Sequence, residues 1–152
     1  MKRIMFVCLG NYCRSPMAEM IFRDMVRKAG LEDEFEIASA ATSSEELGNP
    51  PHRGAQAELR KHGISCGNKR AVRLKASDYD HYDLFLGMDR NNIRNMKALF
   101  GGDPEQKVHL LKEWTDGGEV ADPWWTDDFE STWRDLEPAC KALLEDLTRK
   151  IV

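Results

Sequence analysis

Cys8 and Arg14 stand six positions apart, directly after a short apolar run and before a serine–proline pair. When a loop of this kind joins a buried strand to a helix, its backbone N–H groups can turn inward and hold an anion, and the helix dipole adds partial positive charge. A cysteine at the floor of such a cup is favoured as the thiolate, which is the form that attacks phosphorus. The spacing therefore predicts Cys8 as a nucleophile beneath a bound phosphoryl group.

The other residues of this segment, which we call the cysteine loop (residues 8–15), have matching properties. The planar guanidinium of Arg14 can hold two phosphoryl oxygens at once. Gly10 and Asn11 tolerate the left-handed backbone that such a loop requires. Ser15 is expected to cap the following helix and to donate a hydrogen bond to the sulfur. We expect the whole loop to bind substrate, including the remaining residues Leu9, Tyr12 and Cys13.

A phosphoester leaves most easily when its departing oxygen is protonated, so the site also needs a carboxylic acid. Asp122 is the best candidate, because Pro123 fixes the backbone beside it and two tryptophans follow. Trp124 and Trp125 are adjacent, so at least one of them should be exposed rather than in the core. An exposed aromatic rim suits an aryl phosphate, and the pair is therefore assigned to substrate binding.

Apolar runs alternate with amphipathic segments along the chain. The runs predict strands at residues 2–7, 35–40, 82–86 and 108–111. The amphipathic segments predict helices at residues 15–30, 52–62, 89–100 and 126–151, with residues 122–125 as a loop before the last helix. Such alternation is typical of a parallel sheet covered by helices on both faces. A chain of 152 residues fits one domain spanning residues 1–152.

Composition narrows the class of protein. A formal net charge of −4 argues against a general nucleic-acid binder. No apolar run approaches the ~20 residues of a membrane span, and the N-terminal run is too short for a signal peptide. We expect a cytoplasmic monomer whose four cysteines are thiols, with Cys140 packed in the core.

Together these residues resemble the low-molecular-weight protein tyrosine phosphatases over nearly the whole chain. The strongest matches are residues 8–19, 39–54 and 62–64, Met88 and Asp89 with Asn92, and residues 122–123. The resemblance implies an α/β, flavodoxin-like three-layer sandwich with a four-stranded parallel sheet. It implies hydrolysis of protein phosphotyrosine through a phosphocysteine on Cys8, with Arg14 as phosphate clamp and Asp122 as general acid and then general base. It implies no metal or organic cofactor, and inhibition by inorganic phosphate or other oxyanions.

The resemblance also implies secondary roles. Asn11 and Ser15 would shape the loop, with Ser39 and Asn92 supporting its hydrogen-bond network. Cys13 occupies the position of a cysteine that, in the family, forms a reversible disulfide with the nucleophile. A redox-sensitive off state is therefore expected.

Three positions depart from the usual family pattern. Tyr12 replaces a branched apolar residue or the threonine of arginine phosphatases, so we expect a narrowed or aromatic pocket mouth and no arginine phosphatase activity. Glu45 stands where an aromatic residue often lines the rim, and its charge should disfavour dianions or favour basic flanking residues. Trp124 and Trp125 replace the usual tyrosine or phenylalanine beside the acid.

Other functions fit the sequence less well. An arsenate reductase needs further cysteines about 70–80 residues after the nucleophile, and residues 77–89 contain none. A nucleotide-binding P-loop needs a Gly-Lys-Ser/Thr sequence that is absent here. Zinc needs a second ligand pair at suitable spacing, and the histidines are scattered. A phosphopeptide-binding module remains as the alternative from another class, although binding alone requires neither the thiol nor the acid.

Overall fold

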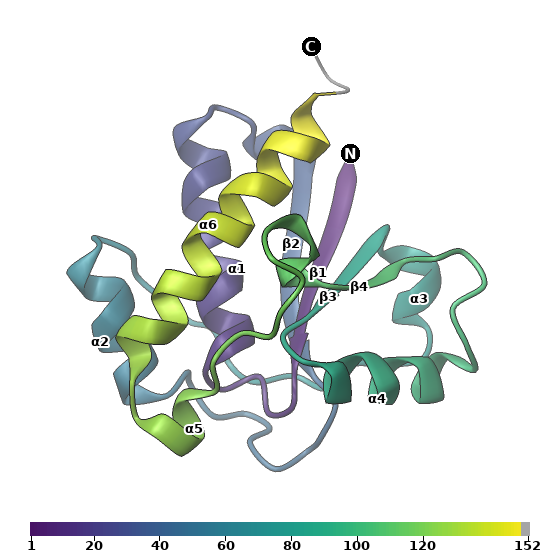
Figure 1. Cartoon of the computed structure of the whole chain (residues 1–152), viewed down its shortest axis with the longest axis horizontal. Coiled ribbons are helices and arrows are strands. Elements are labelled where there is room, and N and C mark those ends of the chain that lie inside the picture. Colours follow the sequence, from purple (N-terminus) through teal and green to yellow (C-terminus); the bar gives the residue numbers. More distant parts are fainter. Residues whose placement is uncertain (150–152) are drawn as a thin grey trace.

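A four-stranded parallel sheet forms the centre of the computed structural model, which describes residues 1–149 (Figure 1). The strand order is β2-β1-β3-β4, and every neighbouring pair is parallel. The strands are β1 (Lys2–Cys8), β2 (Phe35–Ala41), β3 (Leu84–Gly87) and β4 (Val108–Leu110). The predicted α/β architecture is therefore confirmed.

Strand β1 lies at the centre of the sheet because both of its faces are apolar. Ile4, Phe6 and Cys8 point toward one hydrophobic cluster, and Met5 and Val7 point toward a second. Alternate side chains of a strand project to opposite faces, so a strand buried on both sides has a continuous apolar sequence. This burial explains why residues 4–8 contain no charged side chain.

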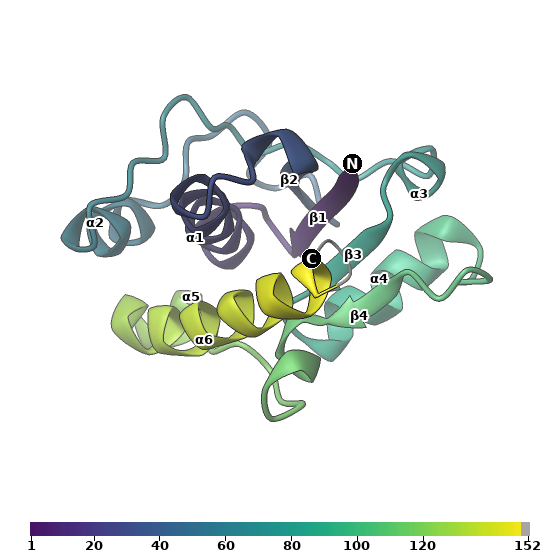
Figure 2. The same cartoon turned by 90° about the horizontal axis from the view of Figure 1, so that it is seen from above.

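Helices cover both faces of the sheet (Figure 2). One face packs against α1 (Arg14–Lys28) and α6 (Phe129–Thr148), with α2 (Arg53–Lys61) beside them. The other packs against α3 (Asp78–His81) and α4 (Arg90–Phe100). The short helix α5 (Pro123–Thr126) and two 3₁₀ helices, η1 (Glu32–Glu34) and η2 (Leu111–Trp114), complete the structure.

Several predicted element boundaries are confirmed. Gly30 follows the end of α1 and Gly101 caps α4, both with a positive φ. Asp89 caps α4 through a reciprocal pair of bonds with Asn92. The last helix begins at Phe129 rather than at residue 126, and its predicted end at residue 151 lies outside the described residues.

The predicted loop at residues 122–125 is wrong, because a short helix forms there. Asp122 accepts a hydrogen bond from the backbone N–H of Trp124, and Pro123 occupies the first helical position. An aspartate cap followed by proline is a favoured helix start. The turn that follows ends at Asp127, which has a φ of 56°.

The strand order creates a crevice at one end of the sheet. From β1 the chain passes through α1 to β2 on one side, whereas β3 leads through α4 to β4 on the other. In open α/β sheets, ligands bind at such a switch point beyond the carboxyl ends of the strands.

Within residues 1–149, no helix combines the length and apolarity needed to cross a membrane.

Candidate active site

The cysteine loop begins at this switch point, with Cys8 as the last residue of β1 and only 3% exposed. Asn11 has a φ of 53°, so the left-handed backbone predicted for it is confirmed. Gly10, for which the same tolerance was noted, does not use it, because its φ is not positive. Gly10 instead lies under the side chain of Glu46, whose Cγ would be 3.4 Å from an added Cβ.

The sulfur of Cys8 has a hydroxyl partner. Ser15 Oγ lies 3.0 Å from Cys8 Sγ and accepts a hydrogen bond from Asn11 Nδ2 at 2.8 Å. Because the hydroxyl oxygen accepts from the amide, its own proton is available to point at the sulfur. The predicted contact between Ser15 and Cys8 is confirmed, and a hydroxyl proton that points at the sulfur would stabilise the thiolate.

The predicted capping role of Ser15 is wrong. Helix α1 begins at Arg14, with Cys13 as the N-cap residue and no side-chain capping bond. Ser15 is already inside the first turn, where its hydroxyl bonds within the cysteine loop. The start of α1 therefore has no side-chain cap, and a helix N-terminus of this kind can hold an anion.

A second layer of polar groups holds Asn11. Asn11 Nδ2 donates to Ser39 Oγ at 2.9 Å, and Ser39 Oγ donates to Glu19 Oε1 at 2.6 Å. Glu19 is only 4% exposed and lies 3.4 Å from Lys69 Nζ. The backbone N–H of Val72 donates to Asn11 Oδ1. The supporting role predicted for Ser39 is thus confirmed by contact, whereas Glu19 and Lys69 were missed; a glutamate on the apolar face of α1 was the available signal.

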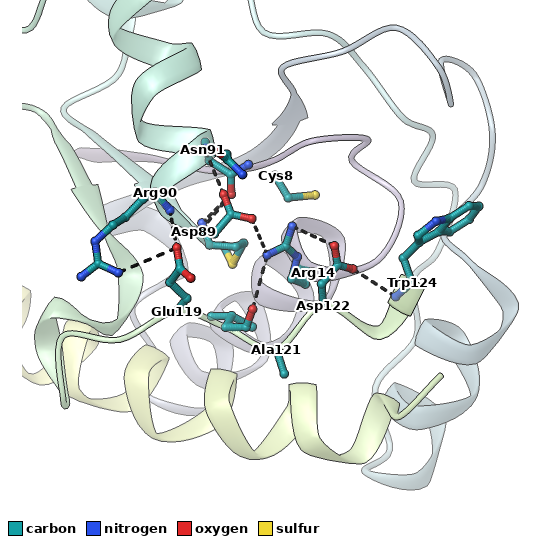
Figure 3. Close-up of polar contacts among 12 residues, drawn as sticks. Cys8, Arg14, Asp89, Arg90, Asn91, Glu119, Ala121, Asp122 and Trp124 are labelled. Atoms are coloured by element: carbon teal, nitrogen blue, oxygen red, sulfur yellow. Dashed lines mark hydrogen bonds and ion pairs between the residues drawn. The ribbon is translucent and has the colours of Figure 1, made fainter. Parts of the chain in front are cut away.

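Arg14 is buried and held from two sides (Figure 3). Its Nη1 donates to Asp89 Oδ2 at 3.0 Å and to the carbonyl of Val120 at 3.3 Å, and its Nη2 lies 3.5 Å from Asp122 Oδ2. Burial alone lowers the pKa of Arg14, but the negative charges of Cys8, Asp122 and Asp89 raise it overall. The guanidinium is therefore a permanent cation at this site.

Asn92 supports Arg14 indirectly, through Asp89. Its Oδ1 accepts from the backbone N–H groups of Met88 and Asp89, and no bond reaches the cysteine loop. Asn92 therefore fixes the residue that holds Arg14, rather than the loop as predicted. The role of Asp89 was recognised in the sequence only as a helix cap.

Asp122 is oriented by the helix that it begins. Its Oδ1 accepts from Trp124 N at 3.0 Å, which leaves Oδ2 directed toward Arg14. Both tryptophans are exposed, Trp124 by 63% and Trp125 by 81%. The prediction that at least one would lie at the surface is confirmed.

A cavity of about 250 Å³ opens above the sulfur and brings most predicted site residues together. Its lining residues are Cys8, Leu9, Gly10, Tyr12, Cys13, Arg14, Glu45, Glu46, Asp122, Trp124 and Trp125. The two remaining predicted residues, Asn11 and Ser15, do not line the cavity and are buried in the loop's hydrogen-bond network. Glu46 was missed, although it follows Glu45 directly.

The cysteine beside the nucleophile is a thiol. Burial, with the nearby charges of Cys8 and Asp122, raises the pKa of Cys13 to about 12. Burial and Glu46 also raise the pKa of Tyr12, so its phenol is neutral. Within the described part of the chain, no three His, Cys, Asp or Glu side chains are grouped so as to hold a metal ion. The site thus brings together the sulfur of Cys8, the cation of Arg14 and the carboxylate of Asp122, with Glu45 and Glu46 also lining the cavity.

The chain as a whole is similar to known proteins. The family model described as low molecular weight phosphotyrosine protein phosphatase matches residues 3–152. The low molecular weight protein-tyrosine-phosphatase YfkJ of Bacillus subtilis is 36% identical, with 97% of this chain and 96% of the relative covered. Its crystal structure superposes with a TM-score of 0.95 at 37% identity, over 99% of this chain and 96% of that chain. A low molecular weight phosphotyrosine protein phosphatase of Gallus gallus is 38% identical, over 95% of this chain and 94% of its own length.

Proposed function

The chain belongs to the low molecular weight phosphotyrosine protein phosphatase family, and on this premise we propose that it hydrolyses phosphotyrosine in proteins through a phosphocysteine intermediate. Cys8 is the nucleophile, Arg14 binds the phosphoryl oxygens, and Asp122 is the general acid and base. The observation that carries the proposal is the convergence of these three side chains on one cavity at the switch point of the sheet.

In the first step the Cys8 thiolate attacks phosphorus, and the bond from phosphorus to the tyrosine oxygen breaks. The charge on the phosphoryl oxygens is stabilised by loop amides, the start of α1 and Arg14. Asp122, in its acid form, gives its proton to the departing phenolic oxygen. Its place in the lining of the same cavity as Cys8, next to the exposed Trp124, supports its reach to the departing oxygen.

In the second step water attacks the phosphocysteine while the Asp122 carboxylate takes one of its protons. Inorganic phosphate is released, the sulfur returns as thiolate and Asp122 is again an acid, so both groups are restored. The Ser15 hydroxyl supports the thiolate as a leaving group, because it can donate to Sγ at 3.0 Å. Each step thus uses the same cup for the transferred phosphoryl group.

The surroundings of the cavity support an aromatic phosphate as substrate. Tyr12, Trp124 and Trp125 supply aromatic surface around the opening, where a phenyl ring would lie once its phosphate reached Cys8. Glu45 and Glu46 add negative charge on the same rim. We propose that this charge disfavours acidic residues beside the phosphotyrosine and favours basic ones.

The proposal is tested with purified protein and p-nitrophenyl phosphate at mildly acidic pH in the presence of a chelator. Wild type should release phosphate, and Cys8→Ser should abolish turnover while still binding inorganic phosphate. Rapid quenching during turnover should trap phosphate on Cys8 of the wild type. Turnover by Cys8→Ser at the wild-type rate would overturn the assignment, and binding without turnover by wild type would favour a phosphopeptide-binding module.

A further inference from the structure

Three aromatic rings run from the cavity to the start of α6. Tyr12 lines the cavity and meets the ring of His52 edge-on, with centroids 5.1 Å apart and an interplanar angle of 73°. His52 in turn stacks on Phe129, at 5.0 Å and 28°. We call these three residues the aromatic ladder. Within residues 1–149, the cavity's other aromatic residues, Trp124 and Trp125, pair with no further ring.

The middle ring of the ladder is fixed by the backbone. The N–H of His52 donates to the carbonyl of Tyr12 at 2.8 Å, and the N–H of Gly54 donates to His52 Nδ1 at 2.8 Å. His52 therefore caps α2 with its ring and bonds the cysteine loop with its main chain. Gly54 leaves room for the next ring, since a Cβ there would lie 2.2 Å from Phe129 Cε2.

The segment that carries the acid Asp122 (residues 122–128) ends directly before Phe129. Phe129 therefore connects the ladder to this acid segment. The other end of this acid segment is also tied to α6. Thr132 Oγ1 donates to the carbonyl of Ala121 at 2.9 Å, and Asp135 accepts from the N–H of Ala121 at 2.9 Å. The acid segment is thus anchored at both ends, and one anchor belongs to the ladder.

We propose that the aromatic ladder is a specificity element, in which His52 and Phe129 are positioning residues that act through Tyr12. The edge-on contact with His52 favours one position of the Tyr12 ring at the mouth of the cavity. The Tyr12 ring therefore forms a wall against which a substrate's phenyl ring packs as its phosphate reaches Cys8. This inference rests on the proposed function and adds residues that do not themselves line the cavity.

Two competitive inhibitors distinguish ring packing against Tyr12 from anion binding around Cys8. Inorganic phosphate uses only the cup around Cys8, whereas phenylphosphonate also places a ring beside Tyr12. If the ladder fixes the wall, disrupting it should weaken phenylphosphonate selectively, because a favourable aromatic contact is lost while the anion site is unchanged. The quantity to measure is the ratio of the two inhibition constants, determined against p-nitrophenyl phosphate.

Two substitutions at His52 divide its functions. His52→Asn keeps a capping acceptor for α2 but removes the ring, whereas His52→Phe keeps a ring but removes the cap. We expect His52→Asn and Phe129→Leu to raise the phenylphosphonate constant about 3- to 10-fold relative to phosphate. His52→Phe should retain the wild-type ratio.

The chain offers a matched control at the other end of α2. His62 stacks on Trp133 of α6 at 3.6 Å and 2°, so it joins the same two helices but does not contact the cysteine loop. His62→Asn should leave the ratio of inhibition constants unchanged.

The possible results are distinct. A selective weakening of phenylphosphonate in both His52→Asn and Phe129→Leu, together with a wild-type ratio in His52→Phe, supports the ladder. Equal weakening of both inhibitors, an unchanged ratio, or the same shift in His62→Asn overturns it. Failure of phosphate to inhibit the wild type would count against the proposed function instead, because phosphate does not reach the ladder.

Discussion

Asp89 accepts a hydrogen bond from Nη1 of Arg14 at 3.0 Å with the same carboxylate that caps α4. One oxygen, Oδ2, faces the guanidinium, and the other, Oδ1, accepts from the N–H of Asn92 at 2.8 Å. The position of the proposed phosphate clamp is therefore tied to the start of a helix on the opposite face of the sheet from α1. Such a rigid support matters because a small misplacement of a clamp weakens binding in the transition state.

Asp89→Asn tests this support, because asparagine has a single acceptor oxygen. If that oxygen still caps α4, the amide NH2 faces the guanidinium as a second donor, so both the hydrogen bond to Arg14 and the negative charge are lost. We expect kcat/KM for a phosphotyrosine peptide to fall about 10- to 100-fold, measured by phosphate release. Glu119→Gln is the control: Glu119 accepts from the N–H of Arg90 at the same helix start but does not contact Arg14. An equal loss in both variants would indicate a general charge effect rather than positioning.

The general-acid role of Asp122 predicts a dependence on the leaving group. Asp122→Asn keeps an acceptor for the N–H of Trp124 but cannot donate the proton, so a phosphotyrosine peptide should lose about 10²- to 10⁴-fold in rate. p-Nitrophenyl phosphate should lose less, because nitrophenolate departs readily without protonation. Single-turnover rates give the comparison, with Asp128→Asn in the same segment as the control. Equal losses for the two substrates would exclude Asp122 as the acid.

Cys13 is expected to protect the nucleophile from irreversible oxidation. Peroxide oxidises the Cys8 thiolate to a sulfenic acid, and the Cys13 thiol can then condense with it, releasing water and forming a disulfide that dithiothreitol reduces. Cys13→Ser should therefore recover several-fold less activity after peroxide and reductant. Cys66→Ser, which removes a buried thiol outside the cavity, should recover like wild type. Full recovery by Cys13→Ser would rule out the protective disulfide.

Asp103 should contribute stability that depends on pH. Burial alone raises its pKa, but bonds from the Tyr79 hydroxyl at 2.7 Å and from the N–H groups of Lys107 and Val108 lower it overall. A lowered carboxyl pKa stabilises the fold above the unfolded value of about 3.9, and this contribution is lost as the pH falls through the folded value. The free energy of unfolding of Asp103→Asn should therefore be about 1–2 kcal/mol lower than that of wild type at pH 7, and the difference should be smaller near pH 3. Urea titrations of wild type and Asp103→Asn at the two pH values measure the difference in their free energies of unfolding. A difference that does not change with pH would contradict the prediction.

Gly54 should not tolerate a methyl group while Phe129 keeps its place. Gly54→Ala puts a Cβ 2.2 Å from the ring, so the ring or α2 must shift. We expect a loss of about 1–3 kcal/mol in the free energy of unfolding, despite the better helix propensity of alanine. Phe129→Leu should make the same substitution less costly, and a double-mutant cycle measures the coupling. Additive losses would show that the close approach has no energetic consequence.

The amino-acid sequence by itself was sufficient for the features that depend on neighbours along the chain. The nucleophile, its arginine and the strand and helix around them lie within one short stretch, so their spacing alone predicts an anion cup. Asp89 as a cap and the left-handed Asn11 are likewise local, since capping and φ preferences involve only a few residues. The alternation of apolar runs predicted the parallel sheet for the same reason.

The tertiary structure decided everything that depends on residues distant in sequence. The residues that meet Arg14 include Asp89, 75 positions away, and Val120, 106 positions away, and their approach follows from β3 pairing beside β1. The buried carboxylate of Glu19 and the aromatic ladder arise in the same way. The capping role of Ser15 failed for a local reason instead: α1 begins at Arg14, so the hydroxyl of Ser15 lies inside the first turn and bonds Cys8 and Asn11 within the loop. Spacing identifies groups that could react, but only the packing of strands and helices determines which of them meet.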